Sequence, residues 1–255
     1  MATLNYNISG NGIPLVLIHG FPLSSKIWDN QSILSKKCNL VLPDLPGSGK
    51  STFQSFTLES LAEIIHNDLI EIGIEKAVVM GHSMGGYLAL AYAQKFPESL
   101  LGFGLISSHP FADTAEGKAG RQAMIDRVKK EGSSYVPEFY IPKIFSENSI
   151  KTKEEIVKTA VEIMKKAERT LIIAGQESMI TRPDRSHVLI KMKVPVLLIN
   201  GSEDPTVPKQ RRDEMVALVP NSTVVTIKNS GHMPMMESPD EVNLALEHFI
   251  SQIIK

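Results

Sequence analysis

A serine flanked by glycines is the residue of this chain whose surroundings best suit a nucleophile. Ser83 lies in residues 81–86 at the G-x-S-x-G spacing, after an apolar run at 77–80 and before strong helix formers at 87–93. The pattern predicts a buried strand, a very tight turn and a helix. Such a turn leaves no room for side chains beside it, so glycines are needed. It holds the serine in a strained backbone with its hydroxyl clear of the sheet edge.

Two further polar residues have the chemistry that such a serine requires. A serine hydroxyl is a weak nucleophile, so it needs a base to take its proton and a carboxylate to orient that base. Asp204 and His232 each follow an apolar run typical of a buried strand. Because functional groups gather at the carboxyl ends of parallel strands, we predict Ser83 as nucleophile, His232 as base and Asp204 as orienting acid. Asp44 also ends a predicted strand and is the other candidate for the acid.

His232 is preferred over the other histidines because Gly231 precedes it and its loop joins the last strand to a helix. A loop of this kind can reach across the site. His82 precedes the serine and is expected to point away from the Ser83 side chain. The remaining histidines lie within helices, at the edges of an insertion, or on a loop with another use: His19, His66, His109, His187 and His248.

Two backbone N–H groups are expected near the serine as well. The tetrahedral intermediate of acyl transfer carries an oxyanion, which such groups usually stabilise. Met84 follows the nucleophile directly and is one expected donor. The second is expected from the loop at 19–22, which ends an apolar run at 14–18. Because Pro22 has no N–H, Phe21 is the natural donor of that loop.

Residues 44–51 resemble a phosphate-binding P-loop but lack its full pattern. A Walker A motif requires a glycine five positions before Gly49, and Asp44 occupies that position. No clear helix follows directly, because residues 52–56 intervene. We therefore reject nucleotide binding at this loop.

Apolar runs alternate with helical patterns along most of the chain. A half-exposed edge strand is predicted at 4–8, strands buried on both faces at 14–18, 39–42, 77–80, 100–106 and 194–199, and a last strand at 223–227. Helices are predicted at 58–72, 87–96 and 208–218 and from 238 onward. Strands that alternate with helices form a parallel sheet covered on both faces, so the predicted fold class is α/β.

Residues 109–187 differ from the rest because they contain no clear strand. Charged helical stretches lie near 121–130 and 154–167, and a third helix is expected to begin at 171. Between the first two lies a turn-rich stretch with Gly132, Pro137 and Pro142. We expect a helical insertion that divides one core into residues 1–108 and 188–255.

Composition favours one large globular domain and argues against a nucleic-acid-binding, disulfide-bonded or membrane-spanning protein. A chain of 255 residues with 42% hydrophobic residues suits one large domain with an insertion, and a net charge of −1 gives no basic surface for nucleic acid. The single cysteine, Cys38, permits no internal disulfide and lies in an apolar setting typical of an inert thiol. Residues 1–6 lack the features of a signal peptide, and no run approaches membrane-spanning length, so the cytoplasm is the expected compartment. The sequence implies no metal or cofactor and leaves the oligomeric state open.

Together these pieces resemble the α/β-hydrolase superfamily in its form with a helical lid. The matching stretches cover most of the chain outside the insertion: residues 19–22, 44–49, 81–86, 201–204 and 230–232. The resemblance implies a mostly parallel sheet flanked by helices, with a lid inserted after the family's sixth strand. It also implies a Ser83–His232–Asp204 triad, in the chain order serine, aspartate, histidine, with Phe21 and Met84 as oxyanion donors. One departure is that a single edge strand precedes the strand at 14–18, where many members have two.

The implied reaction is hydrolysis of a small carboxylic ester through an acyl-enzyme. Apolar residues near the site in sequence favour a small apolar acyl group: Phe21, Leu23, Met84, Met233, Met235 and Met236. The loop at 21–24 and Trp28 also resemble the enol-lactonase and cofactor-free haloperoxidase (perhydrolase) branches, so lactone hydrolysis and peracid formation are alternatives. A ligand receptor with vestigial hydrolysis is a further alternative, since fold alone does not define function.

Overall fold

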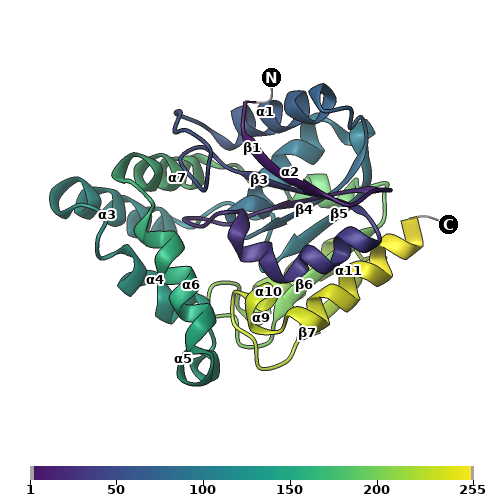
Figure 1. Cartoon of the computed structure of the whole chain (residues 1–255). Coiled ribbons are helices and arrows are strands. Elements are labelled where there is room, and N and C mark those ends of the chain that lie inside the picture. The colour runs from purple at the N-terminus through teal and green to yellow at the C-terminus, as the bar shows by residue number, and fades with distance from the viewer. Residues whose placement is uncertain (1–2, 254–255) are drawn as a thin grey trace.

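A seven-stranded sheet forms the central layer of the molecule (Figure 1). The structure is a computed structural model that describes residues 3–253. Its strands are β1 (Asn5–Ser9), β2 (Pro14–Ile18), β3 (Asn39–Asp44), β4 (Ala77–His82), β5 (Leu100–Ile106), β6 (Val196–Gly201) and β7 (Thr223–Ile227). They lie in the order β1-β3-β2-β4-β5-β6-β7, with β1 antiparallel to β3 and the other pairings parallel. The predicted edge strand and mostly parallel sheet are confirmed, and β4 occupies the centre.

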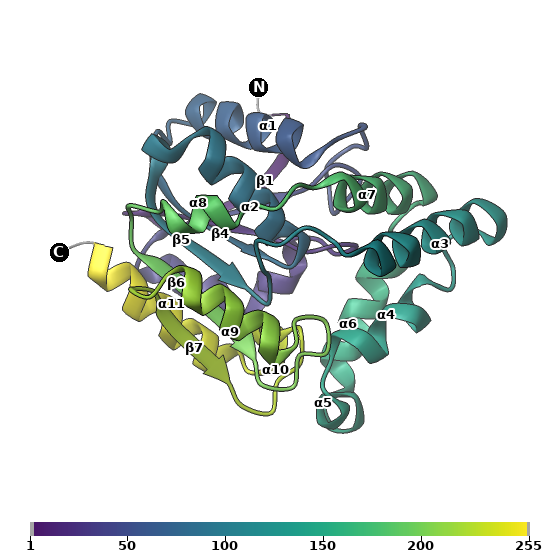
Figure 2. The same cartoon turned by 180° about the vertical axis from the view of Figure 1, so that it is seen from behind.

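Helices cover both faces of the sheet (Figures 1 and 2). One face carries η1 (Ser25–Lys36), α10 (Pro234–Glu237) and α11 (Pro239–Ile253), which pack against one another. The opposite face carries α1 (Leu58–Glu71), α2 (Met84–Lys95), α8 (Ser186–Ile190) and α9 (Lys209–Leu218), and the short η2 (Pro97–Ser99) follows α2. This is the α/β arrangement that the alternating pattern predicts.

The apolar run of β2 shows why the sheet is buried on both sides. Successive side chains of a strand point to opposite faces. Leu15 and Leu17 therefore pack into the core under η1 and α11, whereas Val16 and Ile18 pack into the core under α1 and α2. Cys38 lies in the first of these cores, and burial raises the pKa of its thiol to about 11, as expected for an inert thiol.

The segment between β5 and β6 is helical in every element that the structure describes there. It forms α3 (Ala115–Glu131), α4 (Val136–Ile144), α5 (Glu147–Thr152), α6 (Glu154–Lys165) and α7 (Arg169–Thr181), grouped on one side of the sheet (Figure 1), before α8. The three predicted helices are present, but the prediction of turns between the first two is wrong, because α4 and α5 lie there. Pro137 is accommodated in the first turn of α4, where no N–H bond is required, and Ser146 caps α5.

The boundary predicted at residue 187 falls inside α8, which packs against α2 and α9. The division into a core and an inserted lid stays a prediction. Within residues 3–253, no helix combines the length and apolarity needed to cross a membrane. The cytoplasmic location also stays a prediction, and Met1 and Ala2 of the stretch tested for a signal peptide lie outside the described residues.

Two glycine substitutions, one at the turn after β4 and one in the exposed helix α3, test whether the backbones approach closely at that turn. A Cβ at Gly81 would collide with the Gly85 carbonyl, whereas a Cβ at Gly120 in α3 would meet nothing within 4 Å. We expect Gly81→Ala to lower the free energy of unfolding by about 3 kcal/mol or more, because a well-packed site cannot move aside. Gly120→Ala should raise it by about 0.5–1 kcal/mol. Urea unfolding measures both, and a Gly81→Ala midpoint equal to the wild type would contradict the close approach.

Candidate active site

The turn from β4 into α2 holds Ser83 in a backbone conformation that few residues adopt. Its φ is 52° and its ψ is −118°, in the positive-φ region that is strained for any residue with a side chain. Side chains are excluded on both flanks, because a Cβ at Gly81 would strike the Gly85 carbonyl and one at Gly85 would strike those of Ile18 and His19. The strand, tight turn and helix therefore form as the sequence predicts, and Ser83 stays half-buried.

Asp204 and His232 meet at the same edge of the sheet. His232 Nδ1 lies 2.8 Å from Asp204 Oδ2, and both side chains are almost fully buried. The other Asp204 oxygen, Oδ1, accepts hydrogen bonds from the backbone N–H groups of Thr206 (2.8 Å) and Val207 (3.0 Å). Burial raises the pKa of Asp204, but His232 and the two N–H donors outweigh this effect and lower the pKa, so the carboxylate is ionised.

The loop of His232 is fixed by contacts with its neighbours. A Cβ at Gly201, the last residue of β6, would collide with the Gly231 carbonyl, so the two loops pack backbone to backbone. Glu203 N–H donates to Ser230 O at 2.8 Å, and His232 N–H donates to Ile144 O at 2.8 Å. These bonds leave the His232 side chain facing Asp204.

Glu237 is a positioning residue that our sequence reasoning missed. Its carboxylate is buried and accepts N–H bonds from Gly231 (2.9 Å) and Met233 (3.2 Å), on either side of His232, and from Ser146 (3.0 Å). Three backbone donors satisfy a charge that would otherwise be costly to bury. A lone acidic residue directly after a methionine-rich apolar run was the available signal for this role.

The loop after β2 lies directly against the serine. A Cβ at Gly20 would come within 3.1 Å of Ser83 Cβ and 2.5 Å of His82 Nδ1, so only glycine permits this approach. Phe21 follows, and within residues 3–253 its N–H has no hydrogen-bond acceptor. Met84 is the first residue of α2, where a helical N–H has no intrahelical partner. Both predicted oxyanion donors thus lie at the serine.

His82 and His19 are buried next to Ser83, and burial keeps both side chains neutral. His82 Nε2 donates to the backbone oxygen of His232 at 2.8 Å, so the His82 side chain turns away from the serine hydroxyl. Burial, assisted by His232, lowers the pKa of His82 to about 3. His19 Nε2 accepts from Leu45 N–H at 3.0 Å, and burial lowers its pKa too. Neither ring is available as the base.

A cavity of about 140 Å³ opens beside Ser83 and His232. Its apolar wall includes Phe21, Leu23 and Met233, as the sequence indicates. Met84, Met235 and Met236 instead pack into the two hydrophobic cores. The polar part of its lining, here called the polar wall, comes largely from the helical segment, with Tyr87, Arg121, Tyr140 and Lys143 among its residues. Sequence reasoning missed this polar wall.

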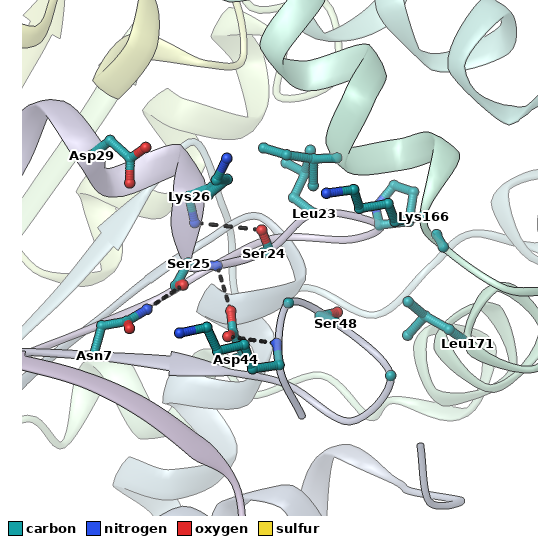
Figure 3. A pocket seen from close by; sticks show the side chains of 16 residues that line it. Asn7, Leu23, Ser24, Ser25, Lys26, Asp29, Asp44, Ser48, Lys166 and Leu171 are labelled. Atoms are coloured by element: carbon teal, nitrogen blue, oxygen red, sulfur yellow. Dashed lines mark hydrogen bonds between the residues drawn. The ribbon is translucent and has the colours of Figure 1, made fainter. Parts of the chain in front are cut away.

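Asp44, the alternative acid, has a different role. Its carboxylate accepts N–H bonds from Ser25 and Lys50, each at 3.0 Å, and from Asn5 Nδ2 at 3.0 Å. Figure 3 shows the Asp44 carboxylate beneath the start of η1, beside a larger cavity of about 440 Å³. The P-loop-like stretch therefore wraps around its own carboxylate, in place of a phosphate, and this geometry supports the rejection of nucleotide binding.

Leu23 is the residue that touches both cavities. It is 2% exposed and lines the small cavity at Ser83 as well as the larger one beside Asp44 (Figure 3). Among residues 3–253, no group of three or more His, Cys, Asp or Glu side chains is arranged to hold a metal ion.

Comparison with known proteins identifies the family. Residues 15–245 match the alpha/beta hydrolase family, and the chain belongs to it. An esterase from the thermophile Thermogutta terrifontis, solved with malate bound, superposes with a TM-score of 0.94 at 30% identity, covering 98% of this chain and 93% of that one. A pimeloyl-[acyl-carrier protein] methyl ester esterase of Yersinia enterocolitica is 26% identical over 260 residues, 99% of either chain. These similarities indicate a hydrolase of the esterase type.

A third similarity concerns the fold alone. The enol-lactonase of Burkholderia xenovorans superposes with a TM-score of 0.89 at 19% identity, covering 97% of this chain and 96% of that one. The resemblance predicted from the sequence motifs, to a family that includes esterases and enol-lactonases, is therefore confirmed.

The buried histidines make stability depend on pH in a defined direction. Burial, followed by the charges of Arg182 and Arg211, lowers the pKa of His109 to about 3, so it stays neutral in the native state like His82. The unfolded chain binds these protons below about pH 6.5, so stability falls as pH drops from there towards 3, by about 1.4 kcal/mol per pH unit for each histidine at most.

We expect His109→Gln to reduce the pH dependence of the free energy of unfolding by up to about 1.4 kcal/mol per pH unit, the equivalent of one proton, and the exposed control Ser55→Ala to leave it unchanged. Urea unfolding at pH 7.5, 6.0 and 5.0 measures the slope. An unaltered slope in His109→Gln would mean that His109 is protonated in the folded protein.

Proposed function

We propose that this protein hydrolyses small carboxylic esters through an acyl-enzyme, with Ser83, His232 and Asp204 as its catalytic residues. The observation that carries the proposal is the pairing of Asp204 with His232 in the loops that face Ser83, beside one cavity that Ser83 and His232 both line. The esterase similarity supports the reaction class.

In the proposed mechanism, His232 Nε2 takes the proton of Ser83 Oγ as that oxygen attacks the ester carbonyl. Asp204 holds the Nδ1–H side of the imidazole and stabilises the imidazolium that forms. The N–H groups of Phe21 and Met84 stabilise the oxyanion. His232 then gives its proton to the leaving alcohol, and a water molecule, activated in the same way, releases the acid and regenerates Ser83.

We also propose that residues 109–187 act as the lid of this site. The support is that the cavity wall includes side chains of α3, α4 and α7: Arg121, Tyr140, Lys143, Ile144 and Met179. The modest volume of about 140 Å³ favours short substrates, and its apolar side accommodates a short apolar portion of the ester.

Replacement of the serine tests the reaction. Ser83→Ala should lower kcat/KM for p-nitrophenyl acetate by at least about a thousandfold, because removal of the nucleophile removes the acyl-enzyme route. The exposed Ser55→Ala variant is the matched control. Near-full activity of Ser83→Ala would refute the assignment. An enol-lactone, and acetate with peroxide, belong in the same substrate panel, and phosphonate labelling of Ser83 without turnover of any ester would favour a receptor.

Leu23 should set the length of the acyl chain. Leu23→Ala is expected to join the two cavities and to raise the ratio of kcat/KM for p-nitrophenyl hexanoate over the acetate, by about fourfold per methylene accommodated. The variant should also lose about 2–5 kcal/mol of stability, so kinetics are measured well below its melting temperature. Ile163→Ala, which alters only the larger cavity, is the control. An unchanged ratio in folded Leu23→Ala would show that Leu23 is no barrier.

A further inference from the structure

The polar wall of the small cavity belongs to a connected chain of groups in which Gln176 is buried and Asp113, Arg121 and Tyr140 are half-buried. Asp113 Oδ2 accepts from Arg121 Nε at 2.5 Å, and Arg121 Nη1 donates to Gln176 Oε1 at 3.2 Å. Gln176 Nε2 in turn donates to the Tyr140 hydroxyl at 2.6 Å. Gln176 is 1% exposed, and Arg121 and Tyr140 both line the cavity that contains Ser83.

In this network the Tyr140 hydroxyl can donate a hydrogen bond into the cavity. The Tyr140 oxygen already accepts the bond from Gln176, so its own O–H is free to donate elsewhere. Burial raises the pKa of Tyr140 to about 12, so the hydroxyl remains protonated at neutral pH. Tyr140 therefore presents a donor to whatever occupies the cavity.

Positively charged groups outnumber carboxylates around the cavity, even when the Asp204 carboxylate that pairs with His232 is counted. Asp113 is shared between two guanidinium groups, because Arg182 Nη2 also donates to it, at 2.6 Å. One carboxylate thus faces two cations, Arg121 and Arg182, and Lys143 adds a third at the cavity wall. Of the described residues that line the cavity, none is an aspartate or a glutamate. Burial chiefly, and then the charges of Arg182 and Arg211, lower the pKa of the nearby His109.

A purely structural role for the network does not account for its position. Holding α3, α4 and α7 together requires bonds among these helices, but it does not require Arg121 and Tyr140 to line a cavity. Here the cationic group and the O–H donor both reach the wall of a small cavity, where an apolar ester would strip water from Arg121 without replacing its hydrogen bonds.

We propose that the substrate carries a free carboxylate, which Arg121 binds as an ion pair and to which Tyr140 donates a hydrogen bond. The proposal rests on the ester hydrolase function proposed above and deepens it. The cavity volume points to monoesters of short dicarboxylic acids, with the ester carbonyl at Ser83 and the second carboxylate a few bonds away. Neither group takes part in the bond changes, so both act on specificity.

Two methyl esters of equal length test the proposal. Monomethyl succinate ends in a carboxylate, whereas methyl butyrate ends in a methyl group at the same position. A pH-stat follows the hydrolysis of both esters. We expect wild-type kcat/KM to favour monomethyl succinate by about 10- to 100-fold, the range for a hydrogen-bonded charge pair in a dry site. Arg121→Gln should remove most of this preference, and Tyr140→Phe should reduce it several-fold.

Arg127→Gln is the matched control, because Arg127 lies on the same helix, pairs with Glu131 at the surface and is absent from the cavity wall. It should keep the wild-type ratio. If Arg121→Gln fails to fold, inhibition of the wild type supplies the answer: succinate should inhibit methyl butyrate hydrolysis at least tenfold more strongly than butyrate does.

The outcomes separate this proposal from the proposed function. Hydrolysis of methyl butyrate with a ratio at or below one, or a folded Arg121→Gln that keeps the wild-type ratio, would overturn carboxylate recognition while leaving the esterase intact. Equal inhibition by succinate and butyrate would overturn it as well. Failure to hydrolyse either ester, together with no phosphonate labelling of Ser83, would instead overturn the function on which the proposal rests.

Discussion

The close approach of β4 to α2 is the constraint on which the site depends. Ser83 is held at a φ of 52°, and glycines at 81 and 85 are needed because any side chain there would strike a backbone carbonyl. Strain of this kind costs about 1–3 kcal/mol and persists only where the surrounding structure over-determines it. β4 supplies this support, since it is the central strand, is paired on both edges and is buried on both faces. Ser83 N–H also donates to Ile106 O on β5, which fixes the turn against its neighbour.

The parallel sheet brings Asp204 and His232 to the same edge, but it does not orient their side chains. A second set of hydrogen bonds fixes the His232 loop. The Glu237 carboxylate accepts bonds from three backbone N–H groups, and the His232 N–H donates to Ile144 O at the end of α4. The His232 loop is thereby tied both to the core and to the helical segment. Movement of α4 relative to the sheet would therefore strain the bond between Ile144 O and the His232 N–H.

Most strands, helix ends and candidate site residues could be predicted from short patterns in the sequence. Strands buried on both faces are continuous apolar runs, and α1 begins at a Thr57 cap and is followed by Gly73 at a φ of +84°, as its residues indicate. Ser83, Asp204 and His232 could be chosen because each stands at a strand end. The helix α4 was missed because prolines normally break helices. Pro137 lies in its first turn, where a proline costs nothing, whereas Pro142 lies inside the helix, near its end. Glu237 was missed because its partners are backbone groups, which leave no trace in residue types.

The polar wall of the cavity shows why substrate preference is harder to infer than reaction type. The methionines near the proposed catalytic residues in sequence indicated an apolar pocket, yet Met84, Met235 and Met236 pack into the cores. The polar wall joins residues that are far apart in the sequence, since Gln176 lies 55 positions after Arg121, the residue to which it is hydrogen-bonded. Their juxtaposition depends on how α3, α4 and α7 pack, which is tertiary information. In the proposed function, the loops at the strand ends supply the reacting groups, while the packing of the helical segment determines which charged groups line the cavity.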